Sequence, residues 1–255
     1  MTKIAKIIGN TFLSVLEYVL IFIIAFAFFI RTEVVQTFLA QKVTHYLTEL
    51  LAAEVSIERV AITFIDKAFL DGILVMDQHN DTLLYVKELY VNFGEYDAAT
   101  MRIDVDHVRL SSTTVKLKKY LGEEHLNFQF IVDAFKSAPD TTKKAPDFTL
   151  NVAQIELVNS RFVLDNQHIQ PISNGIDYAH LDVSNLQLLA HDTHILPGQY
   201  STSIQHISAH EKSGVEVNKL SALAQFNDNG LSAQELVIEL LRSRLEASTF
   251  DMKVN

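Results

Sequence analysis

Two pairs of histidines have a spacing that could bind a metal. His191 and His194 are separated by two residues, and His206 and His210 by three. Imidazole nitrogens are common zinc ligands, so either pair could chelate if one strand or turn presented both rings. His206 and His210 share a face only if a strand runs unbroken through Ser208. No glutamate-rich catalytic partner stands beside either pair, and we interpret these histidines as solvated side chains.

Two pairs of carboxylates also invite a chemical interpretation. Asp104 and Asp106 could act as an acid and base pair, and Asp77 with Asp81 could begin a calcium loop. Neither pair has the spacing or the glycine that such sites require, so we interpret them as solvent-facing strand positions and turn residues. The chain has no cysteine, no glycine-rich phosphate loop and no G-x-S-x-G motif. The sequence therefore predicts neither an enzyme nor a cofactor or metal site.

The charge of the chain excludes another class of function. Its 255 residues are 48% hydrophobic and carry a formal charge of -10. Three of the 21 basic and one of the 31 acidic residues lie at or before Arg31, which leaves 18 against 30 downstream. Nucleic acids and anionic headgroups are bound by clustered Lys and Arg, so we expect no nucleic-acid partner.

Residues 12–30 form an apolar run that is long enough to cross a bilayer as a helix, which needs about 20 such residues. Lys3 and Lys6 precede the run and an acidic remainder follows it, which predicts a cytoplasmic N-terminus and an exported body. Glu17 is expected near the upstream interface, or protonated or paired there. The residues that we assign to the membrane anchor are Leu13, Val19, Ile21, Ile24, Phe28 and Ile30.

A cleaved signal peptide is the competing interpretation of this run. Ala25 and Ala27 loosely form the small-x-small pattern of a cleavage site. Phe28, Phe29 and Ile30 continue the apolar run past that point, which favours an uncleaved, single-pass anchor.

The elements that follow are predicted from hydrophobic periodicity. Apolar residues from 35 to 51 recur at steps of three and four, which predicts an amphipathic helix close to the membrane. From residue 55 the period becomes two, which predicts half-buried strands, interrupted only by a short helix or strand-to-helix segment at 126–135. Turn residues such as those at 71–72, 111–113, 197–198 and 213–214 are expected to bound these strands.

We divide the chain into four regions: a tail and anchor at 1–33, the helix and a first β-subregion at 34–136, a loop at 137–147, and a second β-subregion at 148–255. Many strands and few helices favour a mainly β, antiparallel sheet whose apolar face must be covered. A barrel, a sandwich and an open groove all satisfy this pattern. The chain ends within strand-like sequence, which suggests that it is the front of a longer protein.

Several segments resemble one known family. Residues 34–93 carry a helix that passes into EVSI, an F-x-D-G stretch followed by a hydrophobic run, and DTLLY. NFQFIVDAF at 127–135, IELVNSRF at 155–162 and SRLEASTFDMK at 243–253 complete the pattern. Together with the single anchor, these segments resemble the N-terminal region of TamB-like translocation and assembly module proteins of the AsmA superfamily, of the Bacteroidota type.

The resemblance implies an inner-membrane anchor and a periplasmic body built as a long, taco-shaped β-groove. It also implies a partner barrel of the outer-membrane assembly class, reached through a C-terminal region that this sequence does not contain. The implied role in outer-membrane biogenesis is either translocation and assembly of outer-membrane proteins or bridge-like transfer of phospholipid.

An apolar groove suits the transfer of phospholipid acyl chains on physical grounds. Burying a methylene is worth about 0.8 kcal/mol, so moving a chain of about 16 carbons through water costs on the order of 10 kcal/mol, which a continuous trough would largely remove. The residues that we predict for the groove wall are Val60, Ile62, Phe64, Leu89, Val91, Ile103 and Val105. Two alternatives stay open: a tethered scaffold with a closed core that binds envelope proteins by β-edge pairing, and a tethered enzyme with a polar cleft.

Overall fold

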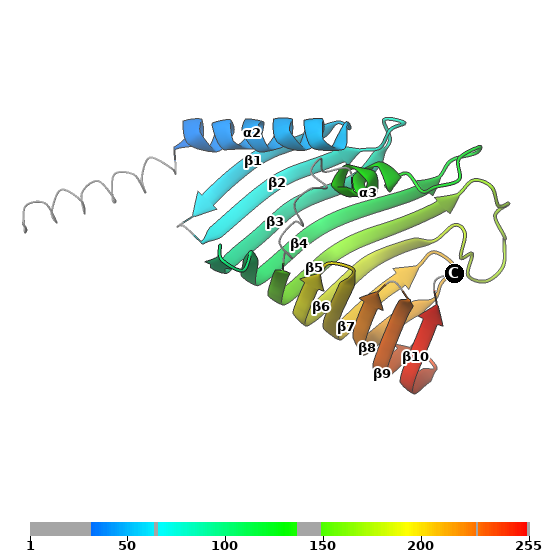
Figure 1. Ribbon diagram of the computed structural model, residues 1–255. Coiled ribbons are helices and arrows are strands. Elements are labelled where there is room, and N and C mark those ends of the chain that lie inside the picture. Colours follow the sequence, from blue (N-terminus) through cyan, green and yellow to red (C-terminus); the bar gives the residue numbers. More distant parts are fainter. Residues whose placement is uncertain (1–31, 64–65, 137–148, 228, 254–255) are drawn as a thin grey trace, which may run out of the picture.

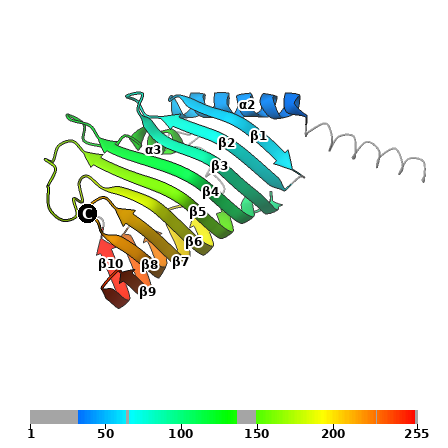
Figure 2. The same ribbon diagram turned by 180° about the vertical axis from the view of Figure 1, so that it is seen from behind.

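One ten-stranded sheet makes up most of the protein, which confirms the prediction of a mainly β fold (Figures 1 and 2). The computed structural model describes residues 32–63, 66–136, 149–227 and 229–253. The helices are α2 (Glu33–Leu51) and α3 (Gln129–Lys136). The strands are β1 (Val55–Thr63), β2 (Lys67–Met76), β3 (Thr82–Asp97), β4 (Arg102–Lys119), β5 (Thr149–Asn166), β6 (Asp182–Leu196), β7 (Gln199–Glu211), β8 (Glu216–Asn227), β9 (Gly230–Leu240) and β10 (Arg244–Lys253).

The strands follow chain order across the sheet, from β1 at one edge to β10 at the other. Within the described residues β1 and β10 do not pair with each other, so the sheet is open rather than closed into a barrel. The predicted anchor lies outside the described residues. Among the helices that are described, none combines the length and hydropathy of a membrane span.

One pair of neighbouring strands corrects the prediction of an antiparallel sheet. β4 and β5 run parallel, from the pair Arg102 and Thr149 to the pair Lys119 and Asn166, whereas all other neighbours are antiparallel. Parallel neighbours cannot be joined by a tight hairpin and need a crossover. The connection between these two strands contains α3, which is what makes the parallel pairing possible.

Helix α2 runs along the β1 edge of the sheet, and α3 lies on one face near the start of β3 and the end of β4 (Figure 1). Both were predicted, α2 from its apolar spacing and α3 from the 126–135 segment. A core of fully buried residues forms beneath them, and Leu47 and Leu50 of α2 pack on it together with Phe130 and Ile131 of α3. The members of this core are Leu51, Ala53, Val55, Val75 and Leu83.

A line of residues with left-handed backbone crosses the middle of the sheet. Gly72 (φ 63°), Ser112 (φ 51°), Asn159 (φ 49°) and Asn185 (φ 51°) lie within β2, β4, β5 and β6. The flanking ladder pairs place Gly72 and Ser112 on either side of Lys87, and Ser112 next to Asn159. We call this line the crease, because a left-handed residue within a strand bends it.

Two predicted turns are wrong, because their residues lie at the crease within strands. Residues 71–72 and 111–113 were expected to end strands, but β2 and β4 run straight through them. Glycine accepts a positive φ without strain, and Ser and Asn adopt it more easily than branched residues do. The same residue types therefore serve a turn or a bend inside a strand.

Gly72→Ala is expected to lower the free energy of unfolding by about 1–2 kcal/mol, because a side chain resists the left-handed backbone. The new Cβ would also meet the carboxyl end of Glu58, which lies against Gly72. Gly175→Ala separates the two causes: its φ is 81°, so it shares the backbone strain, but a Cβ there meets nothing within 4 Å, so its loss should be smaller. Urea unfolding of the full chain in detergent, with Gly72→Ala as stable as the parent, would contradict the crease.

Candidate functional site

An unbroken row of aliphatic side chains crosses all ten strands. Each strand contributes one residue, and each residue is the ladder partner of the next. We call it the aliphatic row; its members, in order from β1 to β10, are Val60, Leu70, Leu89, Leu110, Leu157, Leu188, Ile207, Leu220, Ile238 and Leu245.

A second row runs beside it, two or three residues along each strand. It crosses the eight strands from β1 to β8 without a polar residue. Its members are Ile62, Ala68, Val91, Val108, Ile155, Ala190, Ile204 and Ala222. The two rows together form an apolar strip that runs across the strands rather than along any one of them.

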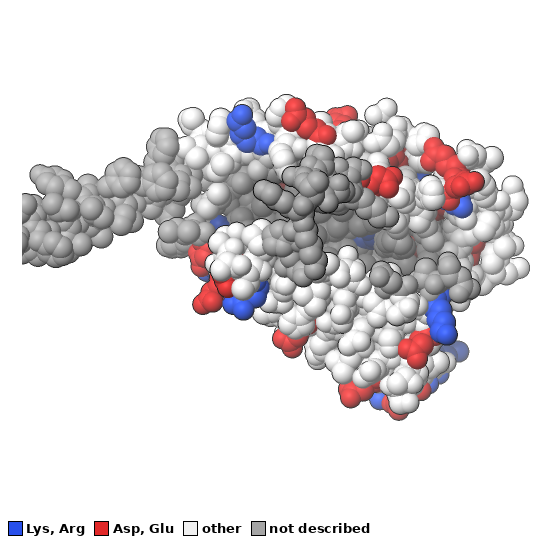
Figure 3. Space-filling view, in the orientation of Figure 1, with Lys and Arg blue, Asp and Glu red and all other residues white. Residues whose placement is uncertain are grey.

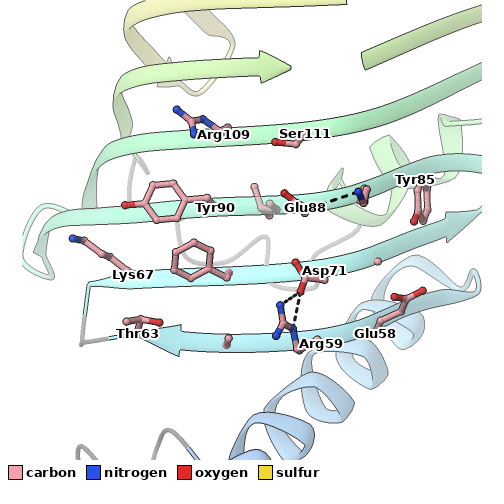
Figure 4. A pocket seen from close by; sticks show the side chains of 15 residues that line it. Glu58, Arg59, Thr63, Lys67, Asp71, Tyr85, Glu88, Tyr90, Arg109 and Ser111 are labelled. Atoms are coloured by element: carbon pink, nitrogen blue, oxygen red, sulfur yellow. Dashed lines mark hydrogen bonds and ion pairs between the residues drawn. The ribbon is translucent and has the colours of Figure 1, made fainter. Parts of the chain in front are cut away.

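Both rows lie on the face that carries α3. In β3, Leu84 packs on the core beneath α3, whereas its neighbour Tyr85 lines a furrow on the opposite, outer face. Glu88 and Tyr90 line the same outer furrow (Figure 4). Leu89 between them also contributes to the lining, but the alternation of side chains along a strand places its side chain on the inner face. Figure 3 views the molecule from this inner side.

The aliphatic row is neither sealed nor fully exposed. Val60 at the β1 end is buried, Leu245 at the β10 end is 53% exposed, and the eight members between them are half-buried. α3 covers the inner face near the start of β3, whereas the row crosses the sheet on the other side of the crease. This arrangement can hold a long apolar ligand that keeps one side open to solvent.

The structure places the predicted wall residues in two groups. Val60 and Leu89 belong to the aliphatic row, and Ile62 and Val91 to the second row. Ile103 and Val105 lie beyond a bulge in β4, where they pair with Tyr96 and Phe93 of β3 and with Leu150 and Val152 of β5. Phe64 lies outside the described residues.

Leu110, Leu157 and Leu188, which the ladders place in the aliphatic row, were not among the predicted wall residues. Their signal was present, because each is an aliphatic residue near the centre of a predicted strand. Periodicity identifies such residues, but it does not tell which of them are ladder partners.

Several charged side chains of β4, β5 and β6 form ion pairs between neighbouring strands. Arg161 binds Asp182 through two hydrogen bonds of 2.8 and 2.5 Å, and the Nε of Arg109 lies 2.5 Å from Oε2 of Glu156. Hydrogen bonds from these arginines hold the pKa of Asp182 and of Glu156 below the usual range of carboxyl groups. The furrow itself has a volume of about 1020 Å³ and follows the crease.

In the structure, the carboxylates of the candidate calcium loop, Asp77 and Asp81, accept hydrogen bonds from neighbouring protein groups. Asp77 is buried and accepts hydrogen bonds from Asn127 Nδ2 (2.8 Å), from the Tyr120 hydroxyl (2.8 Å) and from the backbone N–H of Asp81 and His79. Burial works to raise its pKa, but these donors together hold the pKa below its ordinary value. Asp81 in turn accepts from Tyr120 and from Lys118 Nζ (2.6 Å).

The second carboxylate pair has separate partners. Asp104 accepts hydrogen bonds from Asn151 (2.8 Å) and pairs with Arg102 (3.1 Å), and Asp106 accepts from Asn92 (3.2 Å). Each carboxylate is thus satisfied by its strand neighbours, and the two share no donor.

The histidine pairs do not meet at a common point. His191 and His194 are separated by a left-handed Asp192, and His194 Nδ1 contacts Asn151 Oδ1 at 2.7 Å. His210 lies in β7 opposite Glu216 of β8. Among the residues that the structure describes, no group of three or more His, Asp or Glu side chains could hold a metal ion.

A scan against protein-family models and a search of curated proteins both return no match for this chain.

Proposed function

We propose that this protein is a single-pass anchor in the inner membrane whose periplasmic body holds the acyl chains of phospholipids along the aliphatic row. In this role it serves outer-membrane biogenesis as a bridge-like lipid conduit, as the resemblance to TamB-like proteins implies. The observation that carries the proposal is the aliphatic row itself, since one apolar side chain per strand is continuous from β1 to β10.

The length of the row favours a conduit over a pocket for one molecule. Neighbouring strands lie about 4.8 Å apart, so nine steps from β1 to β10 span roughly 40 Å. The hydrocarbon core of a whole bilayer is about 30 Å thick, so a chain of one leaflet covers only part of the row. Several lipids fit end to end, with their headgroups on the open side.

Photo-crosslinking tests the proposal at single residues. A benzophenone amino acid at Leu110 or Leu157 is expected to form phospholipid adducts in cells, detected by mass spectrometry of the purified chain. Ser111 and Val158 are the matched controls, because they are the next residues in the same strands, are ladder partners of each other, and lie on the outer face. Adducts there should be at least tenfold fewer.

The comparison of adducts on the inner and outer faces distinguishes the possible outcomes of this experiment. Adducts at Leu110 and Leu157 alone support lipid in the row. An absence of adducts at both positions, in a chain that reaches the membrane, overturns the conduit. Equal labelling of Val158 overturns it as well, because lipid would then contact the sheet without regard to the row.

A scaffold that pairs with other proteins through β10 is the second candidate. Among the described residues β10 pairs with β9 alone, and Leu245, Phe250 and Met252 are about half exposed on it. Such an edge can accept a further strand. Phe250→Pro would block that pairing, because alternation from the Leu240–Ser243 hydrogen bond turns the N–H of residue 250 away from β9. This variant should release a bound protein client while it leaves lipid adducts at Leu110 unchanged.

A further inference from the structure

Helix α2 carries large apolar side chains on the side that faces away from the sheet. Val34 is 79% exposed, Phe38 55% and Tyr46 63%. These residues and Lys42 follow one another at steps of four, so they lie on one side of the helix, and we call them the α2 stripe. Lys42 places its ammonium 5.7 Å from the ring centroid of Phe38.

The opposite side of α2 accounts for its packing within the fold. Ala40 and Leu51 are buried there, and Leu47 packs on the core. Figures 1 and 2 show α2 at the rim of the sheet, beside β1, with its outer side clear of all strands. Burial against the sheet therefore does not explain the apolar character of the stripe.

The position of the helix in the chain indicates what covers the stripe. Only three residues separate the end of the apolar run at 12–30 from Val34. A bilayer that holds this run therefore lies within a few residues of the first turn of α2. Three large side chains are too few for a second protein, because a standard interface takes about 800 Å² from each partner.

We propose that the α2 stripe lies on the surface of the bilayer, with the helix axis along the membrane plane. The inference deepens the proposed function and rests on its anchor. Val34 and Phe38 enter the boundary between headgroups and acyl chains, while the Tyr46 hydroxyl and the Lys42 ammonium remain among the headgroups. His45 and Glu49 form an exposed i,i+4 pair near the C-terminal end of α2, which keeps that end wetter.

This orientation brings the aliphatic row to the membrane. A cleft of about 520 Å³ separates α2 from β1, and Ala40 and Thr44 line it on one side while Ile57 and Val60 line it on the other. Val60 is the β1 end of the aliphatic row. A lipid that leaves the bilayer beside α2 thus meets the cleft first and the row next.

Spin labels measure the depth of the stripe directly. The chain has no cysteine, so Phe38→Cys and Tyr46→Cys each provide one labelling site in the full-length protein. Ile172→Cys is the control, because Ile172 is apolar and 57% exposed but lies in the connection between β5 and β6, outside both rows and away from α2. The labelled chains are reconstituted in nanodiscs of phosphatidylethanolamine and phosphatidylglycerol, and power saturation compares oxygen with a water-soluble nickel chelate.

The ratio of oxygen to nickel accessibility is expected to be at least threefold higher at positions 38 and 46 than at position 172. Equal ratios in chains that enter the nanodiscs overturn this inference and leave the anchor intact, whereas chains that elute apart from the nanodiscs overturn both. Dipolar broadening at position 38 that disappears on dilution with unlabelled chain assigns the stripe to a second copy and also overturns the inference. Lipid adducts at Leu110 are scored separately and test the row alone.

Discussion

Replacement of Leu157 by aspartate is expected to reduce phospholipid in the aliphatic row by at least about 30-fold. Leu157 lies in β5 between its ladder partners Leu110 and Leu188, at the middle of the row. A polar group without a hydrogen-bonding partner costs roughly 2 kcal/mol or more in an apolar site, and a carboxylate costs more than that. The measurement is the yield of lipid adducts from a benzophenone amino acid at Leu188.

The control for this variant differs by one position along the strand. Val158→Asp introduces the same charge on the outer face, so the adduct yield at Leu188 should stay within twofold of the parent. Leu157→Gln places a neutral polar group in the row and guards against a folding defect, since its urea midpoint can be compared with that of Val158→Asp. If folded Leu157→Asp and Leu157→Gln both keep the parental yield, lipid does not follow the row.

Local patterns in the sequence were sufficient to predict the helices and most of the hairpin turns. The three- and four-residue steps up to Leu51 predicted α2, and the pairs at 197–198 and 213–214 mark turns that the structure contains. These features depend on residues close together in the chain, which is why periodicity and turn chemistry find them. The open sheet was one of three architectures that the same pattern allowed.

The crease explains why alternation could not be followed along whole strands. In β1 the apolar inner residues on its two sides are Ile57 and Val60, and in β3 they are Val86 and Leu89. Both pairs are three residues apart, so a period of two places them on opposite faces. The consecutive residues Glu58 and Arg59 both line the outer furrow. In a regular strand they would lie on opposite faces, so the alternation of β1 is interrupted at this point.

The pairing of strands was beyond the reach of the sequence for a different reason. The parallel contact of β4 with β5 joins Leu110 to Leu157, and a single sequence contains no signal for a partner 47 positions away. The aliphatic row is made of such contacts from end to end. Its members could be recognised as strand centres, but their alignment depends on register, which bulges shift by one residue at a time.

Asp77→Ala is expected to lower the free energy of unfolding by about 3–5 kcal/mol, the largest loss that we predict. The Asp77 carboxylate is 2% exposed and binds Asn127, Tyr120 and two backbone N–H groups in the turn after β2. Removing it takes the acceptor from the backbone N–H groups of His79 and Asp81 and one of two acceptors from Asn127, whereas the Tyr120 hydroxyl keeps Asp81. Each donor that is left buried without an acceptor costs roughly 1–3 kcal/mol. Asn127 also binds the backbone of Lys116 and Lys118 in β4, so the loss spreads to the strand beside α3.

Asp81→Ala is the control that tells whether the loss of stability in Asp77→Ala comes from its buried hydrogen bonds or from the removal of a negative charge. Asp81 shares the Tyr120 hydroxyl with Asp77, but its side chain is 49% exposed, so water can replace it. We expect a loss of about 1 kcal/mol or less, because a partly exposed ion pair with Lys118 contributes little. Urea unfolding of the full chain in detergent, followed by circular dichroism, compares the two variants. Equal losses would show that the turn is held by its charge, and that the buried hydrogen bonds of Asp77 do not fix the start of β3 beneath α3.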